Sequence, residues 1–342
     1  MKKNFLLLTL AIFGAQICAL TSAHALEYNP GNWNLKLTGY GTAGPAVTRD
    51  DFGAVTDWQL RGEASYRESE DWAFGAVVSQ DAWGVMRENP LRDAFLYTES
   101  PWGRAELGFT NNIAAKLGLG LPDVGGLRIN MDPVIYELAD PYPMLTRTTV
   151  SGTSFAFRAN AVSAPTNPVQ FGFSFAPSQR RFNSASDFGL KYKHSEGKTK
   201  LALSLGASFI DKPSGLAGDI YAPRVHADWR GQLSAGMNLQ YNSWIWGLTA
   251  KATYDRNPLG ALSDGLAFGT GVSYDLLNWS ASVSYMLSDI GIFHEGENYF
   301  AHTGILSLRY KINQFLNVWT SGGIIASVET SPFISGGLMV KF

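Results

Sequence analysis

Histidine, aspartate and glutamate are the residues whose spacing could support catalysis or bind a metal ion. The segment HEGEN at residues 294–298 lacks the second histidine that a zinc-binding H-E-x-x-H helix needs. His226 and Asp228 could act as an acid–base pair only if further partners converged on them, and a solvated pair is the simpler interpretation. We therefore predict neither a catalytic centre nor a metal site at these positions.

Two further motifs could serve a nucleophile or a nucleotide. The chain has no G-x-S-x-G sequence around a candidate nucleophilic serine. Residues 39–44 match the G-x-G-x-x-G pattern, but Pro45 follows where a dinucleotide-binding site requires a helix. The match is a coincidence in a glycine-rich strand, so we expect no cofactor and no enzymatic activity.

A long irregular stretch, residues 111–146, gathers the acidic residues of most interest. It reads NNIAAKLGLGLPDVGGLRINMDPVIYELADPYPMLT and shows no alternation of apolar and polar residues. An insert of this length inside a compact domain is commonly a functional loop. It carries four acidic side chains, which are Asp123, Asp132, Glu137 and Asp140.

The segments that must position this loop have the period of β-strands. In residues 57–68, Trp58, Leu60 and Tyr66 fall on one face, and charged residues such as Arg61 fall on the other. Residues 231–241 and 244–255 repeat the alternation, with Ser, Gly, Asn and Gln on the polar face of the first and Lys and Asp on that of the second. Successive strand side chains point to opposite faces, so each of these segments has one apolar and one polar face.

Sixteen segments are predicted to be strands. They lie at residues 33–48, 57–68, 72–82, 91–98, 102–110, 147–159, 168–176, 187–194, 199–210, 228–241, 244–255, 264–274, 279–288, 301–311, 316–327 and 332–342. The connections after even-numbered strands are mostly tight, and those after odd-numbered strands are mostly long. Short turns at one rim and long loops at the other are typical of outer-membrane β-barrels. Residues 160–167 are long for a tight turn, and residues 328–331 are short for a loop.

Aromatic residues support the same architecture, because many of them fall at the short-turn ends of the predicted strands. Tyrosine and tryptophan favour the membrane–water interface because their rings are amphipathic. The residues concerned are Tyr66, Trp72, Trp102, Tyr192, Tyr241, Trp244, Tyr274, Trp279, Tyr310, Phe315 and Phe342. The predicted fold is a transmembrane 16-stranded antiparallel β-barrel, with residues 111–146 folded inward as its third loop.

The first 25 residues have the pattern of a cleaved secretory signal. Lys2 and Lys3 form a basic start, residues 5–20 are mostly apolar, and residues 23–25 give an A-x-A cleavage site. We therefore expect residues 1–25 to be removed during export.

The remaining residues, 26–342, are expected to form a single barrel domain. The one cysteine, Cys18, is lost with the signal, so no disulfide framework is possible. Removing Lys2 and Lys3 reduces the 27 Lys and Arg to 25, against 29 Asp and Glu, and the net charge becomes −4. A negative net charge argues against a nucleic-acid partner.

Three motifs give the chain a resemblance to the general diffusion porins of Gram-negative bacteria, a family of trimeric 16-stranded barrels. Residues 92–109, RDAFLYTESPWGRAELGF, resemble the porin hairpin that precedes the third loop. Residues 121–126, LPDVGG, resemble the Pro-Glu-Phe-Gly-Gly tip of that loop. The terminal Phe342 is similar to the C-terminal aromatic that the barrel assembly machinery recognises. The strand count and the signal extend the resemblance over the chain.

The resemblance implies a passive channel in the outer membrane for small hydrophilic solutes and ions, assembled as a homotrimer and surrounded by lipid. In the family, acidic residues of the third loop face a basic ladder on the opposite wall. Asp123 takes the loop-tip position, and Asp132, Glu137 and Asp140 are further loop acids. For Asp132 and Asp140, an ordinary solvated charge is the simpler interpretation. Arg61, Arg92 and Arg147 take the ladder positions; the first two face the lumen by parity, and Arg147 would need a bulge in the following strand.

The sequence departs from the family in the loop, because residues 116–121 offer no second acid and Arg128 adds a positive charge. One acid facing three arginines predicts weak selectivity that leans toward anions. Replacing Arg92 with Ala is expected to change selectivity more than folding. Two alternatives are a substrate-specific channel for a sugar or another nutrient, for which Tyr40 and Trp319 are the lumen-facing aromatics, and a non-conducting structural barrel.

Overall fold

The computed structural model describes residues 26–49, 52–83, 91–125, 156–178, 183–211, 229–256, 262–289, 300–326 and 330–342. The described strands belong to one antiparallel sheet. Sixteen of them form the wall: β2 (Trp33–Thr48), β3 (Phe52–Arg67), β4 (Ala73–Trp83), β5 (Leu91–Ser100), β6 (Gly103–Thr110), β7 (Ala156–Ser163), β8 (Val169–Ala176), β9 (Ser184–Glu196), β10 (Thr199–Asp211), β11 (Trp229–Tyr241), β12 (Trp244–Arg256), β13 (Leu262–Leu276), β14 (Trp279–Asp289), β15 (Phe300–Lys311), β16 (Leu316–Ala326) and β17 (Thr330–Lys341).

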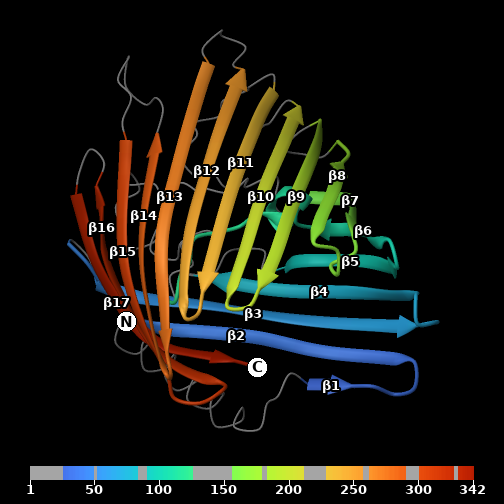
Figure 1. Cartoon of the computed structure of the whole chain (residues 1–342), viewed down its shortest axis with the longest axis horizontal. Coiled ribbons are helices and arrows are strands. Elements are labelled where there is room, and N and C mark those ends of the chain that lie inside the picture. Colours follow the sequence, from blue (N-terminus) through green and yellow to red (C-terminus); the bar gives the residue numbers. More distant parts are fainter. Residues whose placement is uncertain are drawn as a thin grey trace, which may run out of the picture.

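The sheet closes on itself, because each of these strands pairs with the next and β17 pairs with β2. In the closing seam, Phe333 lies opposite Thr48 and Lys341 lies opposite Tyr40. The strands β2–β4 of one wall run at a steep angle to β9–β13 of another (Figure 1). The structure thus confirms the predicted closed 16-stranded antiparallel barrel.

A short additional strand, β1 (Leu26–Tyr28), was not predicted. It pairs with β2 through Leu26 and Leu37, on the stretch of β2 that β17 does not reach. Phe342 continues the edge from the other direction, because its backbone NH and CO both bond to Gly39, at 3.0 and 2.9 Å. β1 and β17 therefore lie in line along one edge of β2.

The two faces of the wall differ in the way the alternation predicts. On β10, Leu205 and Phe209 are 53% and 48% exposed, whereas Ser204 and Ser208 on the other face are 6% and 5% exposed. The same contrast recurs around the ring, with large apolar side chains exposed on the outside and many serine, threonine and glycine residues on the inside, beside buried apolar side chains such as Phe95, Ile305 and Phe333. The apolar surface therefore faces outward and the polar surface encloses the interior.

The aromatic residues at the short-turn ends form exposed pairs between neighbouring strands. The ring centroids of Trp244 and Tyr274 are 4.4 Å apart, and those of Trp279 and Tyr310 are 4.7 Å apart. Trp102 and Trp279 are 79% and 55% exposed on the outer surface. The predicted aromatic belt is therefore present at this rim.

The structure departs from the predicted elements at β3, which begins at Phe52 rather than at residue 57, and around the third loop. The sixth wall strand was predicted at residues 147–159, whereas β7 extends to Ser163, and residues 147–155 lie outside the described part. This extension shortens the connection, predicted at residues 160–167, that is long for a tight turn. The loop also begins with a helical turn, α2 (Ile113–Leu117), which was not predicted.

No helix in the described part of the chain is long and apolar enough to cross a membrane.

Candidate pore constriction

The loop leaves β6 through a capped helical turn that packs on the inner wall. Asn112 begins α2 as its N-cap, accepting a bond from the Ala115 backbone NH at 2.7 Å. Such caps satisfy backbone donors that a helix start leaves open. Ile113 is fully buried against β8 and β9, where a Cβ on Gly189 would lie 2.9 Å from the Ile113 carbonyl oxygen. Glycine at position 189 thus permits the helix to approach the wall closely.

A buried polar cluster holds this turn in place. The Asp187 carboxylate accepts bonds from Asn112 Nδ2 at 3.0 Å, Ser174 Oγ at 2.8 Å and Arg158 Nη1 at 3.2 Å. The side chains of Arg158 and Asp187 are both fully buried. Buried charges are tolerated when they are paired and hydrogen-bonded. The cluster therefore fixes the start of the loop to β7, β8 and β9.

After the helix, the described chain follows the inner wall around the barrel. The Leu119 NH donates to Ser204 Oγ on β10 at 3.1 Å. Further on, Ser284 Oγ on β14 donates to the Pro122 carbonyl at 3.1 Å, and the Val124 NH donates to Ser282 Oγ at 3.2 Å. These bonds fasten residues 119–124 to strands that lie up to 162 positions later in the sequence.

Small wall residues make room for this path. A Cβ on Gly247 of β12 would overlap Pro122 Cδ, and a Cβ on Gly236 of β11 would lie 3.0 Å from Leu119 Cβ. Gly125 in turn lies against the hydroxyls of Ser307 and Ser321 on β15 and β16. Residues 112–125 thus line the β7–β16 wall, and the remaining width of the lumen lies between them and β2–β6.

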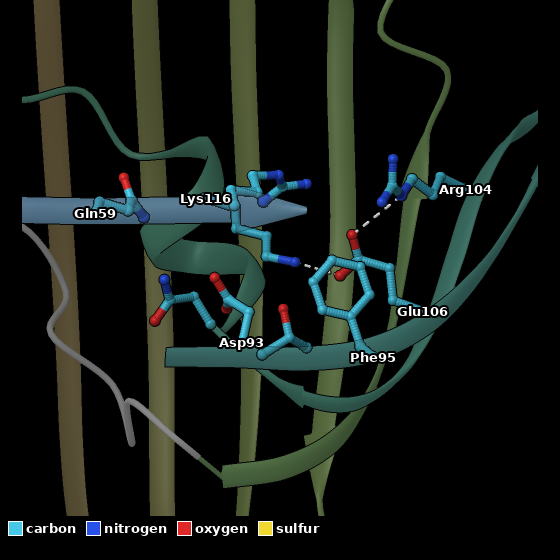
Figure 2. A pocket seen from close by; sticks show the side chains of 9 residues that line it. Gln59, Asp93, Phe95, Arg104, Glu106 and Lys116 are labelled. Atoms are coloured by element: carbon cyan, nitrogen blue, oxygen red, sulfur yellow. Dashed lines mark hydrogen bonds and ion pairs between the residues drawn. The ribbon is translucent and has the colours of Figure 1, made fainter. Parts of the chain in front are cut away.

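Charged side chains of the β2–β6 wall and of the loop meet at one side of the remaining lumen. Lys116 Nζ forms an ion pair with Glu106 Oε2, and Arg104 Nε lies 3.2 Å from Glu106 Oε1. Arg104 Nη1 also lies 2.9 Å from Glu99 Oε1. Figure 2 shows Lys116 and Arg104 reaching Glu106 from opposite sides. The Glu106 side chain is only 6% exposed, so both cations neutralise a largely buried carboxylate.

Aromatic rings support these cations from the wall. The Arg104 guanidinium lies over the Tyr97 ring at 3.6 Å from its centroid, and Lys116 Nζ lies 5.0 Å from the centroid of Phe95. Cations over ring faces are attracted by the ring quadrupole. Phe95, Tyr97 and Val77 are themselves buried together. The apolar cluster thereby limits the positions that the two basic side chains can take.

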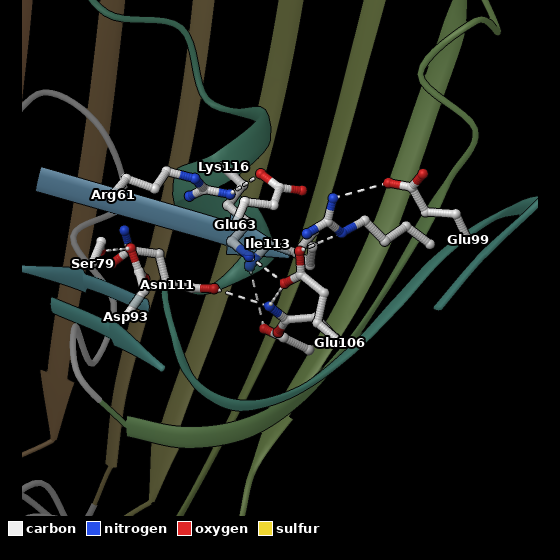
Figure 3. A network of polar contacts seen from close by, with 12 residues as sticks. Arg61, Glu63, Ser79, Asp93, Glu99, Glu106, Asn111, Ile113 and Lys116 are labelled. Carbon is white, nitrogen blue, oxygen red and sulfur yellow. Dashed lines mark hydrogen bonds and ion pairs between the residues drawn. The ribbon is translucent and has the colours of Figure 1, made fainter. Parts of the chain in front are cut away.

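A second ion pair lies next to these charged side chains. Arg61 Nη2 lies 3.4 Å from Glu63 Oε2, and the Tyr97 hydroxyl donates to Glu63 Oε1 at 2.7 Å. Ser79 Oγ donates to Asp93 Oδ2 at 2.8 Å. Figure 3 shows the Arg61–Glu63 and Ser79–Asp93 pairs within a network of polar contacts that also contains Lys116, Glu106 and Glu99. A cavity of about 360 Å³ opens between the network and the loop, lined by Gln59, Arg61, Asp93, Phe95, Arg104, Glu106, Thr110, Asn111 and Lys116.

The environment of Lys116, a residue of the loop, changes its pKa. Burial lowers the pKa of the Lys116 ammonium because the charged form loses solvation, and Glu106 opposes part of that effect. The net direction is downward. Lys116 can therefore lose its charge at a pH at which exposed lysines keep theirs.

The structure describes some of the predicted constriction residues. Arg61 faces the lumen beside the cavity, and Asp123 accepts a bond from the Gly125 NH at 2.9 Å within the loop. Arg92 lies where the register between β4 and β5 shifts, because Ser79 pairs with Asp93 and Gln80 with Leu91. Strand parity does not determine the face of a residue at a bulge. The Arg92 side chain, Asp132, Glu137, Asp140 and Arg147 lie outside the described residues and remain predictions.

Several charged residues of the site, among them Arg104, Glu106, Arg158, Lys116 and Asp187, were not predicted from the sequence. Arg104 and Glu106 share a face of residues 102–110, opposite Ala105, Leu107 and Phe109, so alternation could have identified them. Arg158 follows the same rule in β7, where Phe157 is 40% exposed. Lys116 and Asp187 have no comparable signal, because their roles depend on where the loop turns.

Comparisons with known proteins agree with this fold. No protein-family model matches the chain, and no curated protein matches it by sequence. Among solved structures, an anion-selective porin from Comamonas acidovorans superposes with a TM-score of 0.67 at 11% identity, covering 91% of this chain and all of that one. The trimer form of OmpT from Vibrio cholerae gives the same TM-score, identity and coverage.

A third structure, OmpF of Salmonella typhi in complex with daunomycin, has a TM-score of 0.63 at 14% identity over 93% of this chain and all of that one. Identities this low establish similarity of fold alone. The chain thus has the porin fold, a closed barrel of sixteen antiparallel strands.

Proposed function

We propose that this protein is an outer-membrane porin, a water-filled channel through which small hydrophilic solutes and ions diffuse passively. The observation that supports this proposal is a closed ring that is apolar outside and polar inside, with the described part of its third loop lying on the inner wall. A closed barrel satisfies every backbone group within a bilayer. Export through a signal at residues 1–25 and placement in the outer membrane belong to the same proposal.

The charged constriction is proposed to lie between the loop of residues 111–146 and the β2–β6 wall. There Arg61, Arg104 and Lys116 are each paired with a carboxylate. Paired charges largely cancel at a distance, so the described part of the constriction supports weak selectivity. Asp123 and Arg92 remain the proposed loop and wall charges that would set the residual preference.

The test is conductance of the purified, refolded protein in a planar bilayer. A general diffusion channel gives conductance that rises linearly with solute concentration, and a reversal potential close to zero across a salt gradient indicates weak selectivity. No channels from correctly folded protein, or a strong preference for cations, would contradict the proposal.

A homotrimer embedded in lipid is proposed as the assembly, supported by the family resemblance and by the trimer form of the Vibrio cholerae structure. Phe342 is proposed as the signal for the barrel assembly machinery. Closure of the bilayer channel in three equal steps would support the trimer, and closure in one step would contradict it.

The main alternative is a substrate-specific channel. Tyr40 and Trp319 do face inward, but Trp319 is 1% exposed and donates from Nε1 to Thr42 Oγ1 at 2.7 Å. A ring buried in this way offers little surface for stacking a sugar. Conductance that saturates with a particular solute would favour this alternative, and the absence of conductance would favour a non-conducting structural barrel.

A further inference from the structure

Basic side chains line the inner face of β9 and β10 near the short-turn rim. Lys191 and Lys193 share the β9 face that carries Asp187 and Gly189, and Lys200 takes the corresponding face of β10. In the register, Lys193 lies opposite Ala202 and Lys200 lies opposite Ser195. We name these three residues, Lys191, Lys193 and Lys200, the lysine patch.

The lysine patch has no carboxylate partner among the described residues, although the constriction cations all do. Its pairing neighbours are uncharged, with Gln170 opposite Lys191 on one side and Ser204 on the other. Of the two acids on this strand, Asp187 on the inner face already binds Arg158 and Asn112, and Glu196 lies on the outer face, 3.6 Å from His194 Nε2. Lys193 and Lys200 are exposed, so the patch presents uncompensated positive charge to the lumen.

Further cations stand on the far side of the ring. Arg309 of β15 and Lys341 of β17 face inward, and β17 is eight strands from β9 in a ring of sixteen. Arg309 donates to Ser280 Oγ at 3.2 Å. At this end of the barrel, the lumen-facing carboxylates of β3 and β5 already form ion pairs. Glu63 binds Arg61, and Glu99 binds Arg104. Exposed acids also lie between the two basic groups: Asp275 of β13 on one side of the ring and, on the other, Glu27 of β1, which lies opposite Lys36.

The lysine patch begins directly beyond the loop. Gly189 contacts Ile113 of α2, and Lys191 is the next residue on the same face toward the short-turn rim. An ion that passes between the loop and the β2–β6 wall therefore enters a space with basic side chains on two sides.

We propose that this space is an anion-collecting vestibule that favours small divalent anions, such as sulfate, phosphate esters and dicarboxylates, over chloride. The inference rests on the proposed channel function and adds a solute class to it. A concave surface with one sign of charge and low-dielectric walls concentrates counter-ions. The attraction doubles with the charge of the ion and weakens with salt, because the Debye length is only about 10 Å at 0.1 M. Selectivity therefore arises at the short-turn mouth as well as at the constriction.

The test measures the sulfate-to-chloride permeability ratio from reversal potentials of the purified full chain in a planar bilayer at low and high salt. We expect the triple variant K191Q/K193Q/K200Q to lower this ratio at least about twofold at low salt, with a smaller change at high salt. The triple arginine variant K191R/K193R/K200R keeps the charge and should keep the ratio.

The matched control is K198Q, which removes a lysine from the exposed turn between β9 and β10 rather than from the inner face. K193Q should lower the ratio and K198Q should not. An unchanged ratio in the glutamine triple variant, or equal effects of K193Q and K198Q, overturns the vestibule while the conducting wild type upholds the channel. A wild type that conducts nothing overturns both.

Discussion

Asn112 Nδ2 donates a 3.0 Å hydrogen bond to Asp187 Oδ1, joining the start of the third loop to a wall strand 75 residues later. The same asparagine caps α2 through its Oδ1. One side chain thus sets both the local turn and its place on the wall. The position of the loop therefore depends on a carboxylate that is far from it in sequence.

Replacing Asp187 with Ala should destabilise the barrel and release the start of the loop. The Arg158 side chain would stay fully buried after losing the Asp187 carboxylate, and breaking a buried ion pair typically costs about 3–5 kcal/mol. Unfolding in urea measures the stability, and tryptic cleavage after Lys116 reports release of the loop. Glu196→Ala, an exposed acid on the outer face of the same strand, is the control and should change neither. Equal behaviour of the two variants would show that Asp187 does not position the loop.

Replacing Gly247 with Ala should displace the loop from the wall. The added methyl group would overlap the Pro122 ring, and overpacking of this kind costs about 1–3 kcal/mol. Single-channel conductance should therefore change, and unfolding should begin at a lower urea concentration. Gly304→Ala has open space around its Cβ and serves as the control. Conductance identical to that of the wild type in Gly247→Ala would mean that Pro122 does not limit the channel.

Replacing Arg104 with Ala should shift selectivity toward cations. Glu99 loses its ion pair, and Lys116 remains as the cation that the described residues place beside Glu106, so the constriction gains about one net negative charge. The reversal potential across a salt gradient measures the change. Arg104→Lys retains the charge and should preserve the sign of the potential. If both variants shift it equally, geometry rather than charge is responsible.

Selectivity should depend on pH through Lys116. Because its pKa is lowered by burial, raising the pH neutralises Lys116 before the exposed lysines, and Glu106 is left with less compensation. The channel should therefore become more permeable to cations in that alkaline range. Reversal potentials measured against pH test this, with Lys116→Arg as the control because arginine keeps its charge. A variant with the same pH profile as the wild type would assign the titration to another group.

The barrel could be predicted from the sequence because its signal is local and repeated. Apolar and polar residues alternate over residues 199–210 and 244–255 because one face of each strand contacts an apolar environment and the other faces a polar lumen. The prediction of the sixth strand was less accurate, because β7 ends at Ser163 rather than at residue 159. Alternation weakens there because inward-facing positions such as Arg158 serve contacts with the loop network rather than the lumen.

The site was only partly predictable for a related reason. Arg61 and Asp123 were identified as candidates from parity and motif, and Arg104 and Glu106 carried a parity signal that could have been used. The serines and glycines under the loop have no such signal, since Ser204 or Gly247 would suit any polar inner wall. Their role appears only when residues 119–125 lie on them, and that path depends on tertiary contacts.

The seam between β2 and β17 has a consequence for assembly. Ser335 Oγ bonds to the Pro45 carbonyl across a separation of 290 residues, so the ring can close only after nearly the whole chain has been synthesised. Until then, two strand edges with unpaired backbone groups stay open, and such edges invite aggregation. High contact order also makes folding slow. This protein should therefore require a chaperone that covers those edges until the ring closes.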